Sequence, residues 1–341
     1  MELRLKASSD NVKSRVIMAV MALAFGLLSA MLGQLGMLLV PLVCAPFAVV
    51  LMLERGKRPV LSVTLPILLV TLDAVFNGVY SFSCLCAVGV AFLIYVSLAR
   101  GYLSKGDSAV ASVLLVSVLA FITVLFYGCL MIGSFDLGAA LEYYRDLVDT
   151  TREKWVEMLG QYALSGADPT AHAITPEALR AMYDAYVLSL YSAVVIAAFI
   201  TVGISYKLFV RMMASYVEKK IELYSWRFSL SPIYALSYVL LLLLSLFSNG
   251  NDGFSIVVAN LSNVIMVMLA YMGFMLTDAY FRMKSNGRRG GKLIVVLSVL
   301  LLGSVAMLVI SLIGIFASLA IGKAGNVYDD KNNSQGGNDA G

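Results

Sequence analysis

One acidic side chain stands inside an otherwise apolar stretch, and its position makes it the residue best placed to do chemistry. Asp73 lies in the run 60–79, about two helical turns from the end predicted to be outside. Asn77 follows four residues later and shares its helix face, and Tyr80 comes at the end of the run. An Asp costs roughly 2.5–3.5 kcal/mol at the centre of a membrane helix. These side chains could hold a polar or cationic group, or Asp73 could serve an internal hydrogen bond or lie at the interface.

Two asparagines in a later apolar run are predicted to lie at a depth similar to that of Asp73. Asn260 and Asn263 are about one turn apart in the outer part of the run 254–281. They could complete the same outward-facing pocket. The candidate ligand-binding residues are Asp73, Asn77, Tyr80, Asn260 and Asn263.

Catalytic motifs are missing from the sequence. It contains no His–Glu metal motif, no Walker loop and no Gly-x-Ser-x-Gly, and its single histidine, His172, falls in a polar segment. The four cysteines lie in apolar runs and are interpreted as small, reduced apolar side chains. We therefore expect no catalytic residues, no cofactor and no metal, and ATP-driven work would need a separate ATPase.

The composition excludes a water-soluble globule and predicts an all-α, polytopic transmembrane bundle. Only 13% of the 341 residues are charged and 60% are hydrophobic, whereas soluble domains carry about 25% charged residues. A spanning helix needs about 20 mostly apolar residues, because no backbone group can stay unpaired in lipid. We predict about nine spans, with eight to ten possible: 16–33, 37–53, 60–79, 81–99, 109–133, 186–210, 232–248, 254–281 and 293–321.

The distribution of basic residues predicts the orientation of these spans. Of the 25 Lys and Arg residues, 19 fall in alternate junctions of the chain, and positive charge marks the cytoplasmic side. The N-terminus is therefore predicted inside and the C-terminus outside, in a cytoplasmic (inner) membrane. The predicted regions are a cytoplasmic 1–15, a five-span 16–133, an external 134–185, a four-span 186–321 and a disordered tail 322–341.

The external segment 134–185 carries a helical stripe of mostly apolar side chains. The stripe consists of Leu137, Leu141, Tyr144, Val148, Thr151, Trp155, Met158 and Tyr162. It could pack on the protein's own bundle, which we favour, lie on the membrane surface, or bind a partner.

A second helix is predicted to begin within the same segment. Thr175 is a good N-cap, and Pro176 and Glu177 suit the first turn. No helix breaker follows until past Tyr224, so one helix is predicted to run through a span to a basic, aromatic cytoplasmic end at 207–227, which rests against anionic headgroups or docks a cytosolic partner.

Small residues and prolines mark the first spans. Ala22, Gly26 and Ala30 recur every four residues, a spacing that lets helices approach closely, either within the chain or against a partner. Pro41, Pro46 and Pro66 fall inside spans, where they kink a helix or free backbone groups for a substrate. Glu54, next to Arg55, is interpreted as a charge at the level of the headgroups.

The order of these features resembles the YybS-like family of bacterial membrane proteins, whose function is unassigned. The similarity rests on the stretch Ser225-Trp226-Arg227-Phe228-Ser229-Leu230-Ser231-Pro232, on Asn260-Leu-Ser-Asn263 and on Gly273. The N-terminal part is also similar to the S-components of energy-coupling-factor transporters. That resemblance implies a protein that lacks an ATPase, binds solute near its outer face, and docks a partner through small residues of the first span. S-components usually have six spans.

Three functions fit these expectations. The first is a solute-binding or transport subunit for a small polar molecule, with a separate ATPase or membrane subunit, or a second copy of the chain, as its partner in the lipid bilayer. The second is a non-catalytic membrane scaffold or assembly factor, and the third is an intramembrane enzyme acting on a lipid-linked substrate. We expect no nucleic-acid partner.

Overall fold

The computed structural model describes residues 12–54, 59–77, 82–100, 105–164, 175–217, 232–247, 253–284, 306 and 308–319. Within these ranges the regular elements are helices, so the predicted all-helical class is confirmed. The expectations for Tyr80, His172, the stretch 225–231 and the tail 322–341 concern residues outside this description.

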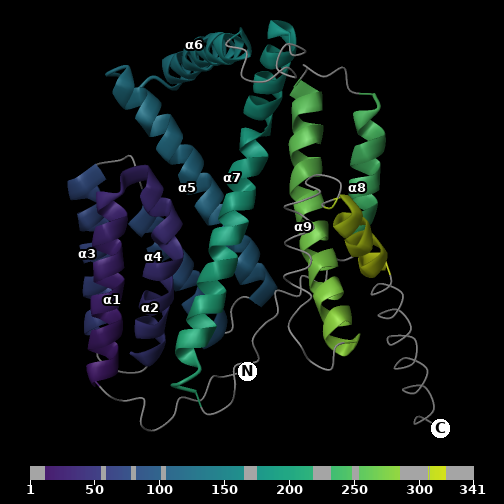
Figure 1. The fold of residues 1–341 in the computed structure, drawn as a ribbon. Coiled ribbons are helices and arrows are strands. Elements are labelled where there is room, and N and C mark those ends of the chain that lie inside the picture. Colours follow the sequence, from purple (N-terminus) through teal and green to yellow (C-terminus); the bar gives the residue numbers. More distant parts are fainter. Residues whose placement is uncertain are drawn as a thin grey trace, which may run out of the picture. The chain divides into compact units, whose positions relative to one another are not determined.

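The chain divides into two compact units, Met1–Tyr224 and Ser225–Gly341, which are described separately (Figure 1). The first unit contains α1 (Val12–Met31), the 3-10 segment η2 (Gly33–Leu39), α2 (Val40–Leu53), α3 (Val60–Asn77), α4 (Ser83–Tyr95), the π-helical turn η3 (Val96–Arg100), α5 (Lys105–Met131), α6 (Leu137–Leu164) and α7 (Pro176–Met213). The second contains α8 (Pro232–Ser245), α9 (Gly253–Lys284) and a further helix over residues 308–319.

Each described apolar helix overlaps one of the predicted apolar runs, whereas residues 293–305 of the last run lie outside the description. Within the described part of the chain, five helices are long and apolar enough to cross a membrane: Val12–Met31, Leu35–Leu53, Val110–Met131, Ser189–Met213 and Phe254–Thr277. Four shorter apolar helices are Val60–Phe76, Ser83–Ala99, Ala235–Ser245 and Leu308–Leu319. How many of them cross the membrane, and on which side each terminus lies, stay predictions.

Helix α2 forms the centre of the first unit. Nearly all of its side chains are buried, and α1, α4 and α7 pack around it. A helix that is apolar all round can be enclosed in this way because it has no polar face to hydrate. The surrounding helices expose large apolar side chains such as Val20, Ile67 and Leu114, as surfaces in contact with lipid do.

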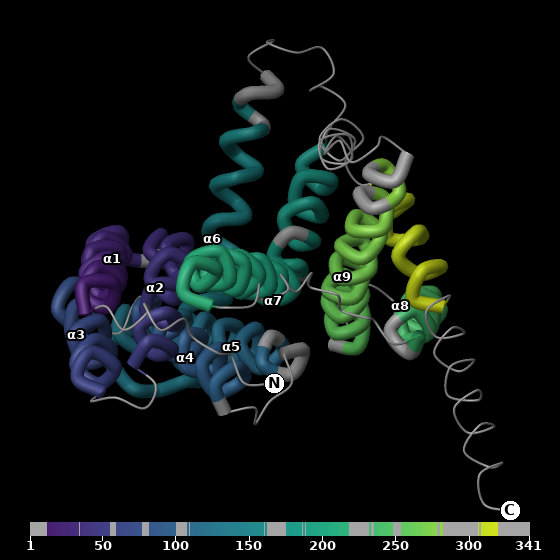
Figure 2. Tube along the Cα trace, turned by 90° about the horizontal axis from the view of Figure 1, so that it is seen from below, coloured from purple at the N-terminus to yellow at the C-terminus, as the bar shows by residue number. Residues whose placement is uncertain are grey.

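Helix α6 runs crosswise to the other helices of its unit. Figure 1 shows it lying across the ends of α5 and α7, and Figure 2, which views α1–α4 nearly end on, shows α6 along its length. The hydroxyl of Tyr144 donates to the carbonyl of Val124 in α5 at 2.5 Å, and its ring lies against Gly128. Part of the predicted stripe therefore packs on the protein's own bundle.

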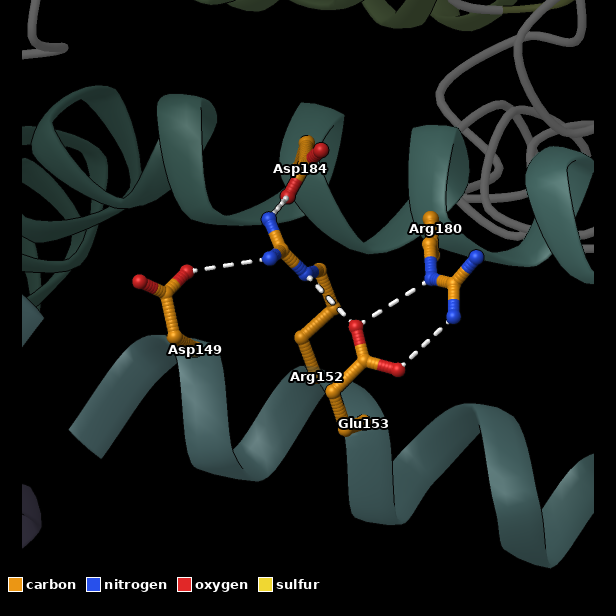
Figure 3. Close-up of polar contacts among 5 residues, drawn as sticks. All are labelled: Asp149, Arg152, Glu153, Arg180 and Asp184. Carbon is orange, nitrogen blue, oxygen red and sulfur yellow. Dashed lines mark hydrogen bonds and ion pairs between the residues drawn. The ribbon is translucent and has the colours of Figure 1, made fainter. Parts of the chain in front are cut away.

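Ion pairs join α6 to the beginning of α7 (Figure 3). Arg180 of α7 donates to both carboxylate oxygens of Glu153, at 3.1 and 2.9 Å. Arg152 lies 3.3 Å from Asp184 of α7 and 3.2 Å from Asp149 of its own helix. These pairs of opposite charge favour one register of α6 against α7. The rings of Trp155 and Tyr183, whose centroids are 5.8 Å apart, add an apolar contact.

Helix α7 begins as predicted and ends earlier than predicted. The Thr175 hydroxyl accepts the N–H of Ala178 at 3.2 Å, and Pro176 is the first helical residue. The helix ends at Met213, where a tight turn replaces the expected continuation to Tyr224. There the Ser215 hydroxyl donates to Met212 at 3.2 Å, a local bond that competes with the helical pattern.

The second unit is organised around a close crossing of α9 with the helix 308–319. A Cβ on Gly273 would collide with the backbone oxygen of Ile310, and one on Gly314 with that of Leu269. The two glycines thus permit direct backbone contact, which is typical of membrane helix pairs. Leu269, Met272 and Ile315 form an apolar core with α8 beside this crossing.

The glycine crossing predicts a strong effect of one added methyl group. Gly273→Ala forces two backbones apart and is expected to cost about 1–3 kcal/mol, as overpacking does. Gly89→Ala in α4 is the matched control, because its new methyl would meet only the movable end of the Leu115 side chain. The measurement is the midpoint of thermal unfolding in one detergent, and equal midpoints for the two variants would contradict the crossing.

The α6–α7 ion pairs predict a dependence on pH. The hydrogen bond from Arg180 lowers the pKa of Glu153, because it favours the charged carboxylate. The pairing therefore stabilises the contact at neutral pH and is lost as the pH falls through that lowered pKa. We expect amides of α6 to lose protection against hydrogen exchange on acidification, after correction for intrinsic rates.

The experiment compares one variant on α7 with a control variant on α6. Arg180→Gln should reduce the protection at neutral pH and remove most of its pH dependence, whereas Arg145→Gln, an exposed position, should behave like the unmodified protein. If the α6 amides of the unmodified protein are equally protected at neutral and at acidic pH, the ion pairs do not hold α6.

Candidate functional site

Asp73 is buried inside the first unit and faces the beginning of α4. Asp73 lies on α3 and is only 4% exposed. The backbone N–H of Cys84 donates to its Oδ2 at 3.1 Å, and the hydroxyl of Ser83 donates to its Oδ1 at 3.5 Å. The carboxylate is therefore bonded to a neighbouring helix of its own chain.

These bonds supply the cap that α4 does not provide for itself. Phe82, the residue before the helix, has a left-handed backbone (φ 47°) and no capping side chain. The first N–H groups of a helix have no intrahelical partner, and a negative charge near them is favourable. Asp73 thus caps α4 from the adjacent helix, which is a physical reason for an acid at this depth.

A chain of hydroxyls extends from Asp73 towards η2. The Ser29 hydroxyl on α1 lies 2.8 Å from the Ser83 oxygen and 2.9 Å from the carbonyl of Gly36, and can donate to either. Gly36 is required there, because a Cβ would collide with the Ser29 carbonyl. We call Ser29, Gly36, Asp73, Ser83 and Cys84 the Asp73 cluster.

Aromatic contacts place the Asp73 cluster at the end of the unit where α6 lies. Phe82, next to Ser83, contacts Phe126 of α5, with ring centroids 6.5 Å apart. Phe126 in turn contacts Phe135, just before α6, at 5.8 Å. The charge pattern of the sequence predicts that this end, called here the α6 end, is outside.

A second acid performs the same task at the opposite end of α3. Glu54 is 4% exposed and follows α2 directly. It accepts the N–H groups of Leu61 at 3.1 Å and Ser62 at 2.7 Å, and the Ser62 hydroxyl as well. Its carboxylate therefore caps the beginning of α3, and its place at the level of the headgroups stays a prediction.

The chemistry available in the Asp73 cluster is hydrogen bonding and negative charge. A carboxylate, two hydroxyls and a backbone carbonyl can accept donors from an ammonium, amide or hydroxyl group. Among the described residues, no three His, Cys, Asp or Glu side chains come together as metal ligands would.

Residues 16–317 match the model of the family described as "Predicted membrane protein (DUF2232)". The chain belongs to this family. The match agrees with the resemblance to YybS-like membrane proteins, and it makes this DUF2232 member a protein of the lipid bilayer. No curated protein and no solved structure matches the chain.

The other predicted pocket residues of this DUF2232 protein are placed only in part. Asn77 is the last residue of α3, and Tyr80 lies outside the described ranges. Asn260, whose Nδ2 donates to the carbonyl of Ile256 at 2.9 Å, and the half-buried Asn263 lie on α9 of the second unit. A pocket that they share with Asp73 stays a prediction.

The small residues of α1 face the interior of the first unit. Ala22 and Ala30 are fully buried. A Cβ on Gly26 would collide with Leu69 of α3, and the Cys84 thiol donates to the Gly26 carbonyl at 3.7 Å. The small residues of α1 are thus in contact with helices of their own chain.

The sequence analysis did not anticipate the partners of Asp73. Ser29, Ser83 and Gly36 are small, and neither their type nor their spacing distinguishes them from other residues of the apolar runs. One signal was available, since Ser83 and Cys84 open an apolar run that has no capping residue before it. An acid near the end of the preceding run is then a candidate cap.

Removing the Asp73 carboxylate is expected to destabilise the protein. Asp73→Ala leaves a buried N–H without its acceptor, which costs about 1–3 kcal/mol, whereas Asp73→Asn keeps an acceptor oxygen and should cost less. Thr71→Ala is the control on the same helix, because the exposed Thr71 hydroxyl donates to the Ile67 carbonyl of its own helix. Chemical unfolding in detergent would contradict the capping role if Asp73→Ala and Thr71→Ala were equally stable.

Proposed function

We propose that this protein is a solute-binding or transport subunit and that the Asp73 cluster holds a small polar solute. The observation that supports this is the combination, at one end of the first unit, of a buried carboxylate with two hydroxyls and a backbone carbonyl of the 3-10 segment η2. A charged residue within a membrane segment is a candidate functional site because it is costly to keep there.

The segment η2 offers a way into the cluster. It is a seven-residue 3-10 helix between α1 and α2, and such segments hold their hydrogen bonds less well than an α-helix. Its Leu35 and Leu38 side chains are exposed, at 64% and 75%, so their movement would disturb little packing. Opening of η2 would separate Gly36 from Ser29 and expose hydrogen-bonding groups, as interrupted helices do in transporters.

The number of helices in the first unit also favours this function. Six of the apolar helices described fall in residues 1–224. S-components, which the N-terminal part of the sequence resembles, usually have six spans. An ATP-driven version of this function requires a separate ATPase, since the sequence has no Walker loop.

A non-catalytic scaffold or assembly factor is the second candidate. It is favoured by the capping bonds of Asp73, because a residue that completes a helix end needs no solute to explain it. The two functions make different demands on Asp73. A solute-binding residue affects a ligand, whereas a cap affects only stability.

A comparison of Asp73→Asn with Glu54→Gln distinguishes the loss of solute binding from the loss of a helix cap. Both replace a buried capping carboxylate by an amide, at opposite ends of α3. A solute present at 100 times its dissociation constant stabilises the folded protein by about 2.7 kcal/mol. Thermal unfolding of the purified protein against a panel of small polar and cationic metabolites should therefore reveal a compound that raises the midpoint.

The expected pattern is specific to one variant. The rise in the unfolding midpoint that the compound causes should be lost in Asp73→Asn and kept in Glu54→Gln. A panel without any stabilising compound, or a shift that survives in Asp73→Asn, would contradict solute binding at the Asp73 cluster. Recovery of the tagged protein from native membranes with an ATPase pair would identify the energy source, and recovery with envelope proteins alone would favour the scaffold.

A further inference from the structure

An exposed row of apolar side chains runs from the end of α5 along α6. Leu137 and Leu141 are each 59% exposed, and Leu147 and Met158 are 44% and 52% exposed. These residues share one side of the helix with Tyr144 when plotted at 3.6 residues per turn. What this row binds can be argued without the Asp73 cluster and without any solute.

The contact of Tyr144 determines which way this side of α6 faces. Its hydroxyl reaches the carbonyl of Val124, which lies seven residues before the end of α5 at Met131. At 1.5 Å per residue, that is about 10 Å below the end of the helix. The apolar side of α6 is therefore turned towards the membrane part of the unit.

The opposite side of α6 carries the charges. Glu142, Asp146 and Glu157 are exposed there, and Asp149 and Glu153 take part in the ion pairs with Arg152 and Arg180. The ion pairs are exposed to solvent rather than enclosed, since the Arg180 and Glu153 side chains are 45% and 52% exposed. Helix α6 thus has an apolar side turned towards α5 and a charged side opposite to it.

We infer that α6 is an in-plane membrane helix whose apolar row is buried between the lipid headgroups and the acyl chains. The row continues the exposed apolar surface of α5, whose last residues, Leu130 and Met131, are 42% and 52% exposed and are followed by Phe135 at 82%. This continuity with a lipid-facing helix favours lipid over a second protein. Helices with one apolar and one charged side can lie in the interface plane with the apolar side below the headgroups.

The ring pair at the far end of α6 fits the same position. Trp155 of α6 and Tyr183 of α7 lie 5.8 Å apart, and both residue types are enriched at the level of the headgroups. The ion pairs beside them hold α6 against α7, so the interfacial helix is fixed to a spanning helix at one end and, through Tyr144, to another at the other end.

The inference is tested by measuring which quencher reaches each side of α6. Full-length protein carries a single reactive cysteine at Leu147→Cys or Met158→Cys on the apolar row, or at Glu142→Cys or Asp146→Cys on the charged side. The four native cysteines are buried and are replaced by alanine or serine only if they label. Each variant bears a bimane fluorophore and is placed in phosphatidylcholine nanodiscs.

Two quenchers then distinguish lipid from water and from protein. A nitroxide near the headgroup of a phospholipid should quench the apolar-row labels at least about twofold more than the charged-side labels, and iodide should show the reverse order. Iodide quenching that is equal at all four positions would overturn the inference by placing both sides in water. Labels at Leu147 and Met158 that neither quencher reaches would overturn it too, because a protein surface would then cover the row.

Discussion

The backbone groups at helix ends constrain this structure more than any other feature, because lipid offers them no hydrogen bonds. Only a few residues connect α2 to α3 and α3 to α4. In both cases the next helix begins with N–H groups that an acid on the preceding helix, or directly after it, satisfies. Glu54 serves the beginning of α3, and Asp73 serves the beginning of α4. The acids are thus held by the helices that they cap, and each negative charge is offset by the positive end of a helix dipole.

This arrangement changes the meaning of a buried acid in a membrane segment. Asp73 attracts attention in the sequence because charge is costly there, and the cost is reduced by bonds to Cys84 and Ser83. A cap and a binding site are compatible at one residue, because a solute can replace one of the donors that a carboxylate accepts and leave the others in place. A solute at this position would compete with the hydroxyl of Ser83 more easily than with the backbone N–H of Cys84. Binding would then perturb the Ser29 side of the cluster and leave the helix cap in place.

Much of the fold follows from local patterns, and much of the site does not. Each apolar run predicts a helix because its length and composition leave no alternative in lipid, and Thr175 predicts the beginning of α7 because a cap bonds within its own turn. The partners of Asp73 lie on other helices, so they depend on packing that no short pattern encodes. Gly273 and Gly314 illustrate the same limit, because each glycine gains its meaning only from the backbone of the other helix. The division into units at Tyr224 depends likewise on contacts between distant residues.

The Asp73 cluster and the surface helix are physically connected. Phe82 stands directly before the helix end that Asp73 caps, and its ring leads through Phe126 to Phe135 at the beginning of α6. Close-packed rings transmit a displacement because they leave little space to absorb it. A change in the backbone around Ser83 would therefore alter the support of α6 at one end, while the ion pairs with α7 keep its other part fixed. In a solute-binding protein this connection would link occupancy of the cluster to the membrane surface, and in a scaffold it would simply make the α6 end rigid.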